Sequence, residues 1–186
     1  MKTREVRTID DARQIVRERK LDYVKVGLFD IDGVMRGKYM QRDKFLSALD
    51  GGFGFCDVVL GWDSSDQLYD NVSVTGWHTG YGDAKVRIIP ESCRELPLEE
   101  RSLLFLAEFA PPTESVCPRG LLRRVLRHGK ELGFNATAAC EFEFFLVEET
   151  PHSAREKNFR NLKNISCLLY TTDAAADTLR VQHGDG

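Results

Sequence analysis

The sequence predicts an α+β fold in which a small mixed sheet is accompanied by one or two helices. Apolar and polar residues alternate over 22–29 and again after position 33, which is the period-2 pattern of strands with one buried face. Two further apolar runs, at 84–90 and 102–109, predict two more strands. Apolar residues at helical spacing over 9–20 add a helix at the N-terminus.

Capping residues mark the helices of this first part. For the helix over 9–20, the candidate N-cap is Asp10 or Thr8, and Ile15 and Val16 form a small apolar side. Asp43 is the expected cap of a second, short helix. Its apolar residues are Phe45, Leu46, Ala48 and Leu49, and it is expected to stop at Gly51-Gly52.

The stretch "KVGLFDIDGVMRGKY" favours a β-hairpin. Before its centre, Val24, Val26 and Leu28 alternate with less apolar residues, and a second alternating run follows Asp32-Gly33. Two alternating runs joined by Asp-Gly are the strongest local signal of a hairpin.

The same letters suggest an alternative. Asp30, Asp32 and Gly33 resemble the D-x-D-G loop of haloacid-dehalogenase-type phosphatases, in which the first Asp attacks phosphorus and the second transfers a proton. That loop ends a central parallel strand covered on both faces, which is expected to be continuously apolar. Lys25 would then lie in the core. The hairpin is therefore favoured, and a Mg²⁺-dependent phosphatase using Asp30 and Asp32 remains the alternative.

A Gly- and aromatic-rich segment spans residues 51–83. It is too long and too aromatic for a passive connection, and long ordered loops are usually functional. Pro111-Pro112 marks a plausible domain boundary.

A further helix is predicted after Pro118, which suits a first helical position, and before Gly133. Its apolar face is made by Leu121, Leu122, Val125, Leu126 and Leu132. Its basic residues are Arg119, Arg123, Arg124, Arg127 and Lys130. Because the whole chain is slightly acidic, we interpret these as a solvated outer face and not as a nucleic-acid site.

The composition excludes several classes of partner. The chain has 26 Lys and Arg against 29 Asp and Glu, so no basic field attracts it to nucleic acid or a membrane. Its five cysteines form no C-x-x-C pair, as is typical of a reduced compartment. The N-terminus is charged where a signal peptide is apolar, and no apolar run reaches about 18 residues. We expect a soluble, cytoplasmic protein that binds small molecules or copies of itself.

Two glutamates carry the clearest chemical signal. In a strand over 136–149, Glu141 and Glu143 would point to the same side, roughly 6 to 7 Å apart, together with Phe145 and Val147. Two carboxylates at that separation repel by roughly 2 kcal/mol at an effective dielectric near 20. A hard cation, Mg²⁺ or Mn²⁺, would compensate, and a raised pKa or an Arg partner would also serve.

Several motifs in order carry a resemblance to a known family. "ACEFEFFLVEE" resembles the E-x-E-F-F-L segment that opens the catalytic domain of the glutamine synthetase family. "GWDSSDQLYDN", "VTGWHTGYGD" and "REKNFRNLK" are similar to its glutamine-synthetase-like or γ-glutamyl-polyamine ligase branch. The resemblance runs from roughly residue 20 to residue 166.

The resemblance implies a domain organisation. An N-terminal helix over 1–20 would precede a β-grasp-like domain over 21–111, whose first hairpin is "DIDGVMRGK". Residues 112–166 would be the truncated start of the catalytic domain, and residues 167–186 would be a non-native tail. The chain would then be an N-terminal fragment.

The resemblance also implies a reaction. The parent would be an ATP-dependent ligase that phosphorylates the γ-carboxylate of glutamate and lets ammonia, a primary amine or a polyamine displace the phosphate. Its cofactors would be ATP and Mg²⁺ or Mn²⁺, and it would form a homo-oligomeric ring. A second alternative is a non-catalytic β-grasp oligomerisation module.

Four site residues follow from the resemblance. Glu141 and Glu143 would each help to bind one of two divalent metals. Asp63 and Ser65 would reach into the neighbouring subunit's active site, where Asp63 helps to bind and deprotonate ammonium. The family usually carries D-G-S-S, whereas this chain has "DSSD", so Asp66 competes with Asp63 for that role. The family's nucleotide-binding residues have no counterpart in this sequence.

Overall fold

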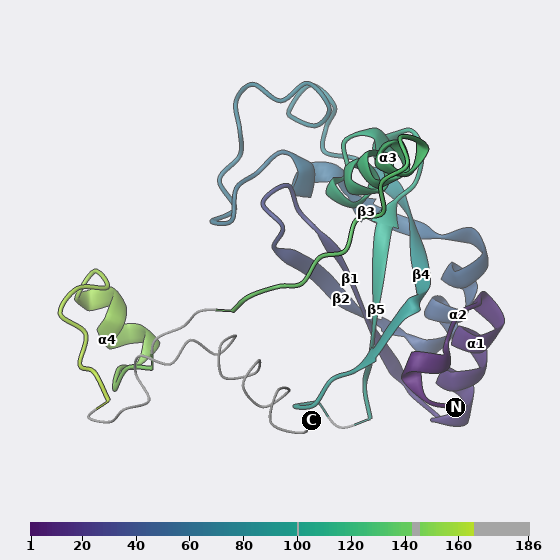
Figure 1. Ribbon diagram of the computed structural model, residues 1–186, viewed down its shortest axis with the longest axis horizontal. Coiled ribbons are helices and arrows are strands. Elements are labelled where there is room, and N and C mark those ends of the chain that lie inside the picture. The colour runs from purple at the N-terminus through teal and green to yellow at the C-terminus, as the bar shows by residue number, and fades with distance from the viewer. Residues whose placement is uncertain (100, 143–145, 166–186) are drawn as a thin grey trace. The chain divides into compact units, whose positions relative to one another are not determined.

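The computed structural model describes residues 1–99, 101–142 and 146–165, and its chain divides into two compact units, Met1–Asn135 and Ala136–Gly186. The first unit contains five strands, shown in Figure 1. These are β1 (Tyr23–Phe29), β2 (Met35–Gln41), β3 (Phe53–Cys56), β4 (Asp83–Glu95) and β5 (Leu103–Phe109).

The strands form one mixed sheet in the order β2-β1-β5-β4-β3. The central strands β1 and β5 are parallel, and the other neighbours are antiparallel. The helices of the unit are α1 (Ile9–Glu18), α2 (Arg42–Gly51) and α3 (Pro118–Glu131). Three short 3-10 helices also occur, at Thr3–Glu5, Asp57–Leu60 and Thr113–Ser115. The predicted α+β class and the four strands predicted before residue 110 are confirmed, and β3 is a further short strand within the segment 51–83. None of the described helices has the length and apolar character needed to cross a bilayer.

The predicted hairpin is confirmed. β1 and β2 pair from Tyr23↔Gln41 to Phe29↔Met35. The connection is closed by a hydrogen bond from the Asp30 N–H to the Val34 carbonyl, with Gly33 at φ +82°. A glycine is favoured there because a left-handed backbone carries no Cβ penalty for it. The turn is thus one residue longer than a two-residue Asp-Gly loop.

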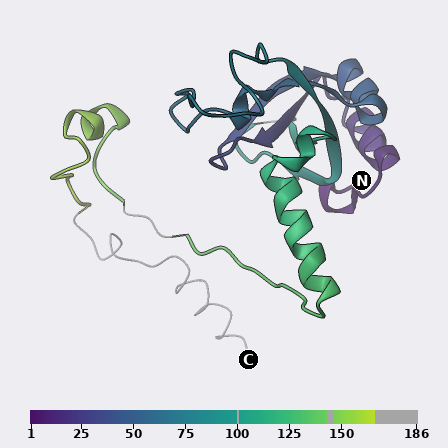
Figure 2. The same cartoon turned by 90° about the horizontal axis from the view of Figure 1, so that it is seen from above.

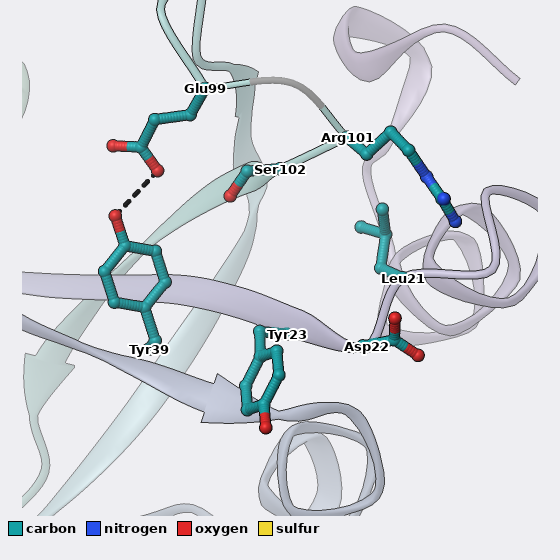
Figure 3. A pocket seen from close by; sticks show the side chains of 7 residues that line it. All are labelled: Leu21, Asp22, Tyr23, Tyr39, Glu99, Arg101 and Ser102. Atoms are coloured by element: carbon teal, nitrogen blue, oxygen red, sulfur yellow. Dashed lines mark hydrogen bonds between the residues drawn. The ribbon is translucent and has the colours of Figure 1, made fainter.

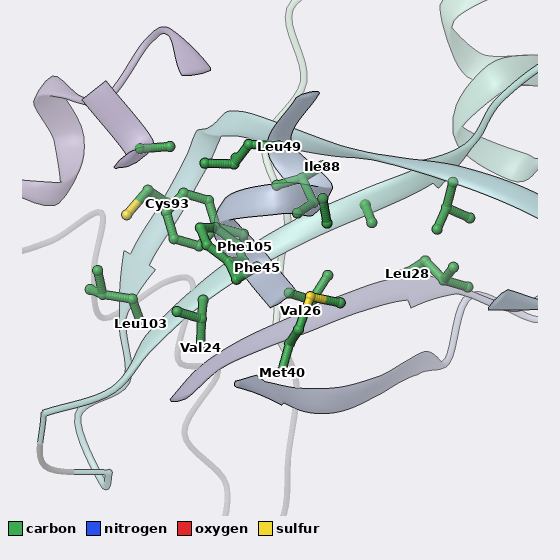
Figure 4. Packing of buried hydrophobic residues seen from close by; sticks show 14 of the residues in the cluster. Val24, Val26, Leu28, Met40, Phe45, Leu49, Ile88, Cys93, Leu103 and Phe105 are labelled. Atoms are coloured by element: carbon green, nitrogen blue, oxygen red, sulfur yellow. The ribbon is translucent and has the colours of Figure 1, made fainter. Parts of the chain in front are cut away.

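The core lies between one face of the sheet and the helices α1 and α2 (Figure 4). Val24, Val26 and Leu28 of β1 all point into it and are at most 1% exposed, as the alternation predicts. Phe45 of α2 packs on Phe105 of β5 with ring centroids 4.9 Å apart. This packing fixes the sheet, and with it the hairpin turn that the candidate site uses.

The predicted helix caps are partly correct. Thr8 caps α1, because its Oγ1 accepts the Asp11 N–H at 3.1 Å. The cap of α2 is Gln41, and Asp43 instead lies in the first turn of that helix. The expectation for Asp43 was wrong because β2 runs directly into α2 and takes the cap position itself.

Helix α3 begins at Pro118 as predicted and extends away from the sheet in Figure 2. The basic side chains of this helix that pair with Glu108 remain partly exposed, so the ion pairs add to the predicted solvated face. Arg119 and Arg123 pair with Glu108 of β5, which is 4% exposed. A buried carboxylate is costly without charged or hydrogen-bonding partners. The two arginine side chains are therefore directed towards Glu108.

The second unit contains α4 (Pro151–Glu156) and an isolated bridge between Val147 and Asn164. The predicted strand over 136–149 does not form in its described residues, 136–142 and 146–149. A strand requires a hydrogen-bonded neighbour, and among these described residues Val147 alone has a bridge partner. The predicted common direction of Glu141 and Glu143 involves Glu143, which lies outside the described residues.

Candidate functional site

Asp30 is a buried structural carboxylate at the hairpin turn. It is 0% exposed, and its Oδ1 accepts the N–H groups of Asp32 at 3.0 Å and Val34 at 2.8 Å. Its Oδ2 accepts the Nε–H of Arg36 at 2.8 Å. A carboxylate that is enclosed and bound in this way cannot attack a phosphate ester. The phosphatase alternative is therefore wrong about Asp30.

Residues 61–68, called the Asp63 loop below, lie beside this turn. Trp62 and Leu68 form an isolated bridge that closes the loop at its base. Within it, Asp63 Oδ1 accepts the N–H groups of Ser65 at 2.8 Å and Gln67 at 2.9 Å. Such a turn, closed by an Asp side chain, orders a short polar loop without regular secondary structure. Both sequence-predicted residues, Asp63 and Ser65, belong to this ordered loop.

Arg36 joins the turn to the loop. Its guanidinium pairs with Asp30 and also, through Nη1, with Asp66 Oδ1 at 2.7 Å. Its carbon Cζ lies 4.9 Å from the centroid of the Trp62 ring, within cation–π range. The hydrogen bond that Arg36 donates to Asp30 and, to a smaller extent, the one that it donates to Asp66 raise the pKa of Arg36 against the opposing effect of burial. Asp66, the rival to Asp63, is thus engaged as an ion-pair partner.

The loop has a negative electrostatic environment. Burial first, and then the charges of Asp32, Asp63 and Asp30, raise the pKa of the Tyr69 hydroxyl. Burial disfavours either sign of charge, whereas the three carboxylates disfavour an anion in particular. Asp32, Asp63 and Asp30 therefore make the surroundings of Tyr69 acidic.

Sequence reasoning missed the parts played by Arg36 and Tyr69. Arg36 lies in a predicted strand and Tyr69 in a predicted loop. No local sequence pattern shows which charged side chains of the strand and the loop come into contact. A weak signal existed for Arg36, because a hairpin with a short turn brings it close to Asp30.

The structure describes one of the two predicted metal ligands. Glu141 is exposed in a stretch without regular structure, and Glu143 lies outside the described residues. Within 1–99, 101–142 and 146–165, no group of three or more His, Cys, Asp or Glu side chains is placed to hold a metal. The described part of the chain therefore does not by itself fit a divalent metal site, and Glu141 and Glu143 remain predicted ligands.

Comparisons with known proteins are consistent with these motifs. Residues 115–184 match the protein family described as the glutamine synthetase catalytic domain. Type-1 glutamine synthetase 2 of Dictyostelium discoideum is 40% identical over 154 residues, which cover 81% of this chain and 30% of that protein. The glutamate–isopropylamine ligase of a Pseudomonas species is 32% identical over 161 residues, or 82% of this chain and 34% of the ligase.

The chain belongs to the glutamine synthetase family. A third relative, the gamma-glutamylethanolamide synthetase GlnA4 of Streptomyces coelicolor, is 28% identical over 158 residues, which cover 83% of this chain and 34% of the synthetase. The chain thus spans about a third of the length of these relatives. The family match includes most of residues 167–186, which lie outside the described residues, and their interpretation as a non-native tail remains a prediction.

A separate cavity of about 530 Å³ lies where β1 begins and β2 ends (Figure 3). It is lined by Leu21, Asp22, Tyr23, Tyr39, Glu99, Arg101 and Ser102. Glu99 accepts hydrogen bonds from Lys25 Nζ at 2.6 Å and from Tyr39 Oη at 2.7 Å. Lys25 first, and then Tyr39, lowers the pKa of the Glu99 carboxyl. Because this carboxylate is already paired, the cavity is a weaker candidate for chemistry than the Asp63 loop.

Proposed function

We propose that this chain is part of an ATP-dependent ligase that joins ammonia or a primary amine to the γ-carboxyl group of glutamate. The single observation that carries the proposal is the similarity, over more than four fifths of the chain, to a glutamine synthetase, a glutamate–isopropylamine ligase and a gamma-glutamylethanolamide synthetase. Two of the three names specify an organic amine, which supports an amine acceptor beside ammonia.

The proposed reaction has two steps. A γ-carboxylate oxygen of glutamate attacks the terminal phosphorus of ATP, and ADP leaves with the electron pair of the broken P–O bond. The amine nitrogen then attacks the acyl carbon of γ-glutamyl phosphate. Inorganic phosphate leaves, and a base takes the proton that the nitrogen loses.

Asp63 is the proposed proton acceptor. An amine is mostly protonated at neutral pH and must lose a proton before its lone pair can attack. The carboxylates near Tyr69, which after burial are the second cause of its raised pKa, would attract the cation, and the ordered Asp63 carboxylate would then accept its proton. Ser65, two residues further along the same loop, would contact the substrate.

Cofactor and assembly are further parts of the proposal. Glu141 and Glu143 would supply oxygen ligands to Mg²⁺ or Mn²⁺, whose charge would offset that of the phosphoryl group of ATP. The other ligands and the ATP site would come from sequence outside these 186 residues. We also propose a β-grasp-like first domain, on the parallel pairing of β1 with β5, and a cytoplasmic ring of identical subunits.

The test compares two proteins, the 186-residue chain and the product of the complete reading frame that contains it. Each is assayed for ADP release and γ-glutamyl-amide formation from glutamate, ATP and Mg²⁺ with ammonia, isopropylamine, ethanolamine or spermidine. We expect no activity from the short chain and activity from the longer protein with at least one amine. A longer protein that assembles but forms no amide would favour the oligomerisation module.

A further inference from the structure

We propose that Arg36 is a positioning residue that holds the Asp63 loop in the orientation needed for amine transfer. The inference rests on the proposed function, because the orientation of this loop matters for catalysis only if Asp63 acts on the amine. Arg36 itself does not contact the reacting groups in this proposal. It acts by fixing the loop that carries Asp63.

The anchor of the arrangement is Asp30. Its two oxygens are held by two backbone N–H groups and by Arg36, and the residue is completely buried at the end of β1. A buried carboxylate is stable only with such partners. Arg36 therefore offsets the cost of burying the Asp30 charge, and Asp30 in turn holds the Arg36 guanidinium in place.

The other side of the guanidinium meets the loop at three points. It pairs with Asp66, it lies over the Trp62 ring, and its Nη2 reaches the Asp63 carbonyl at 3.5 Å. The indole Nε1 of Trp62 is buried without a hydrogen-bond partner among the described residues, so its ring is oriented by packing, including that against Arg36. A planar guanidinium can pair and stack at once, whereas a lysine ammonium cannot.

Arg36 makes none of its described contacts with the Asp63 carboxylate. Arg36 binds the loop through Asp66, Trp62 and the main chain, and the Asp63 carboxylate makes its hydrogen bonds within the loop. Arg36 therefore holds the loop on both sides of Asp63, and it does so without neutralising the negative charge of the Asp63 carboxylate, which would attract an amine.

The first experiment uses the 186-residue chain. In a Trp77→Phe background, Trp62 is the single tryptophan and reports on the loop. We expect Arg36→Gln to shift Trp62 emission to longer wavelength and to increase its quenching by acrylamide. Arg13→Gln is the matched control, because Arg13 is similarly exposed and pairs with Asp50 on helix α2. If Arg36→Gln does not fold, Asp66→Asn replaces it, since Asp66 is 57% exposed and only its side of the pair is lost.

The second experiment uses the longer protein with its ligase activity. Arg36→Gln is expected to raise KM for the amine by roughly tenfold or more, with much smaller changes in KM for glutamate and ATP. Arg36→Lys should recover little of this loss, because it restores the charge but not the planar fork. Arg13→Gln should leave all three KM values unchanged.

The outcomes separate this inference from the proposed function. Unchanged Trp62 emission and quenching in Arg36→Gln, or in Asp66→Asn where it is used, would overturn the inference whatever the enzyme does. Equal changes in all three KM values, or full rescue by lysine, would also overturn it, since a structural charge would then suffice. An inactive wild-type longer protein would overturn the proposed function, and with it the catalytic purpose of Arg36, while the fluorescence result would still decide whether Arg36 orders the loop.

Discussion

The backbone N–H of Ser64 donates a hydrogen bond to Asp32 Oδ2 over 2.8 Å, although 32 positions separate the two residues in the chain. Asp32 lies at the tip of the hairpin turn, and Ser64 follows directly after Asp63. This bond is independent of the Arg36 contacts. The hairpin turn therefore holds the Asp63 loop through two separate acidic residues, one buried and one exposed.

Replacing Asp32 should loosen the loop. In Asp32→Ala the Ser64 N–H loses its acceptor, and the local opening free energy should fall by about 1 kcal/mol. Hydrogen exchange of the Ser64 amide, followed by NMR, should become faster. Asp70→Ala, a change at an exposed position in the same segment, should leave that rate unaltered. Equal exchange in wild type and Asp32→Ala would mean that the bond does not form in solution.

Replacing Asp30 should affect the whole first unit. Asp30→Ala removes the acceptor of two backbone N–H groups and the partner of Arg36, and we expect the free energy of unfolding to fall by about 3 kcal/mol or more. Asp10→Ala is the control, because the Asp10 side chain is 92% exposed and pairs with Arg13 at the surface. Its effect should stay below about 1 kcal/mol.

Urea unfolding, followed by circular dichroism, measures both variants. Similar midpoints for Asp30→Ala and Asp10→Ala would contradict the view that Asp30 is a buried structural carboxylate. It would also reopen the question of whether that residue is accessible for chemistry.

The parts of the fold that were predicted correctly depend on local signals. Alternation placed Val24, Val26 and Leu28 in the core because the side-chain period of a strand is set by backbone geometry alone. Pro118 marked the start of α3 for a similar reason, since its fixed φ suits a first helical position. These signals need no knowledge of what the element packs against.

The predictions that were wrong or missing depend on tertiary contacts with segments distant in the sequence. The segment 136–149 has the alternation of a strand, but its described residues, 136–142 and 146–149, form none. Alternation shows compatibility with a sheet and does not supply a hydrogen-bonded neighbour. For the candidate site, motif resemblance predicted Asp63 and Ser65, which lie in one hydrogen-bonded loop, and their role stays a prediction. It could not find the link from Arg36 to Asp66, because that contact exists only after the hairpin and the loop have been brought together.

The second unit should show a pH dependence centred on Glu149. Lys157, the Ser153 hydroxyl and the Lys163 N–H, in that order, lower the pKa of the Glu149 carboxyl to about 2. The unfolded carboxyl titrates near 4.5, so the stabilisation is fully present above that pH. It is lost as pH falls from there towards 2, because protons then bind preferentially to the unfolded form.

A carboxyl ¹³C titration by NMR would test this directly. Glu149 should titrate well below 4.5, and Lys157→Gln should move its midpoint upward by removing the largest cause of the shift. A wild-type midpoint at the ordinary value, or one that Lys157→Gln leaves in place, would show that these contacts do not persist in solution.

The last prediction concerns subunit cooperation in the longer protein, and it rests on the proposed ring. If Asp63 serves the active site of a neighbouring subunit, Asp63→Ala should leave assembly intact and slow the amine-dependent step. Glu143→Gln should instead weaken metal binding within its own subunit, since it removes an anionic oxygen ligand. The aromatic segment around the loop is suited to such an interface, because Trp77 is 82% and Tyr69 is 40% exposed.

Mixing the two variants under conditions that allow subunit exchange tests whether Asp63 acts in the active site of a neighbouring subunit. Some interfaces would then pair an intact Asp63 from one chain with an intact Glu143 from the next, and activity should exceed the sum of the two variants measured alone. Exchange is verified by mass spectrometry of differently tagged subunits, and mixtures of each variant with itself are the controls. Activity no higher than that sum, with exchange verified, would mean that Asp63 acts within its own chain or has no part in the reaction.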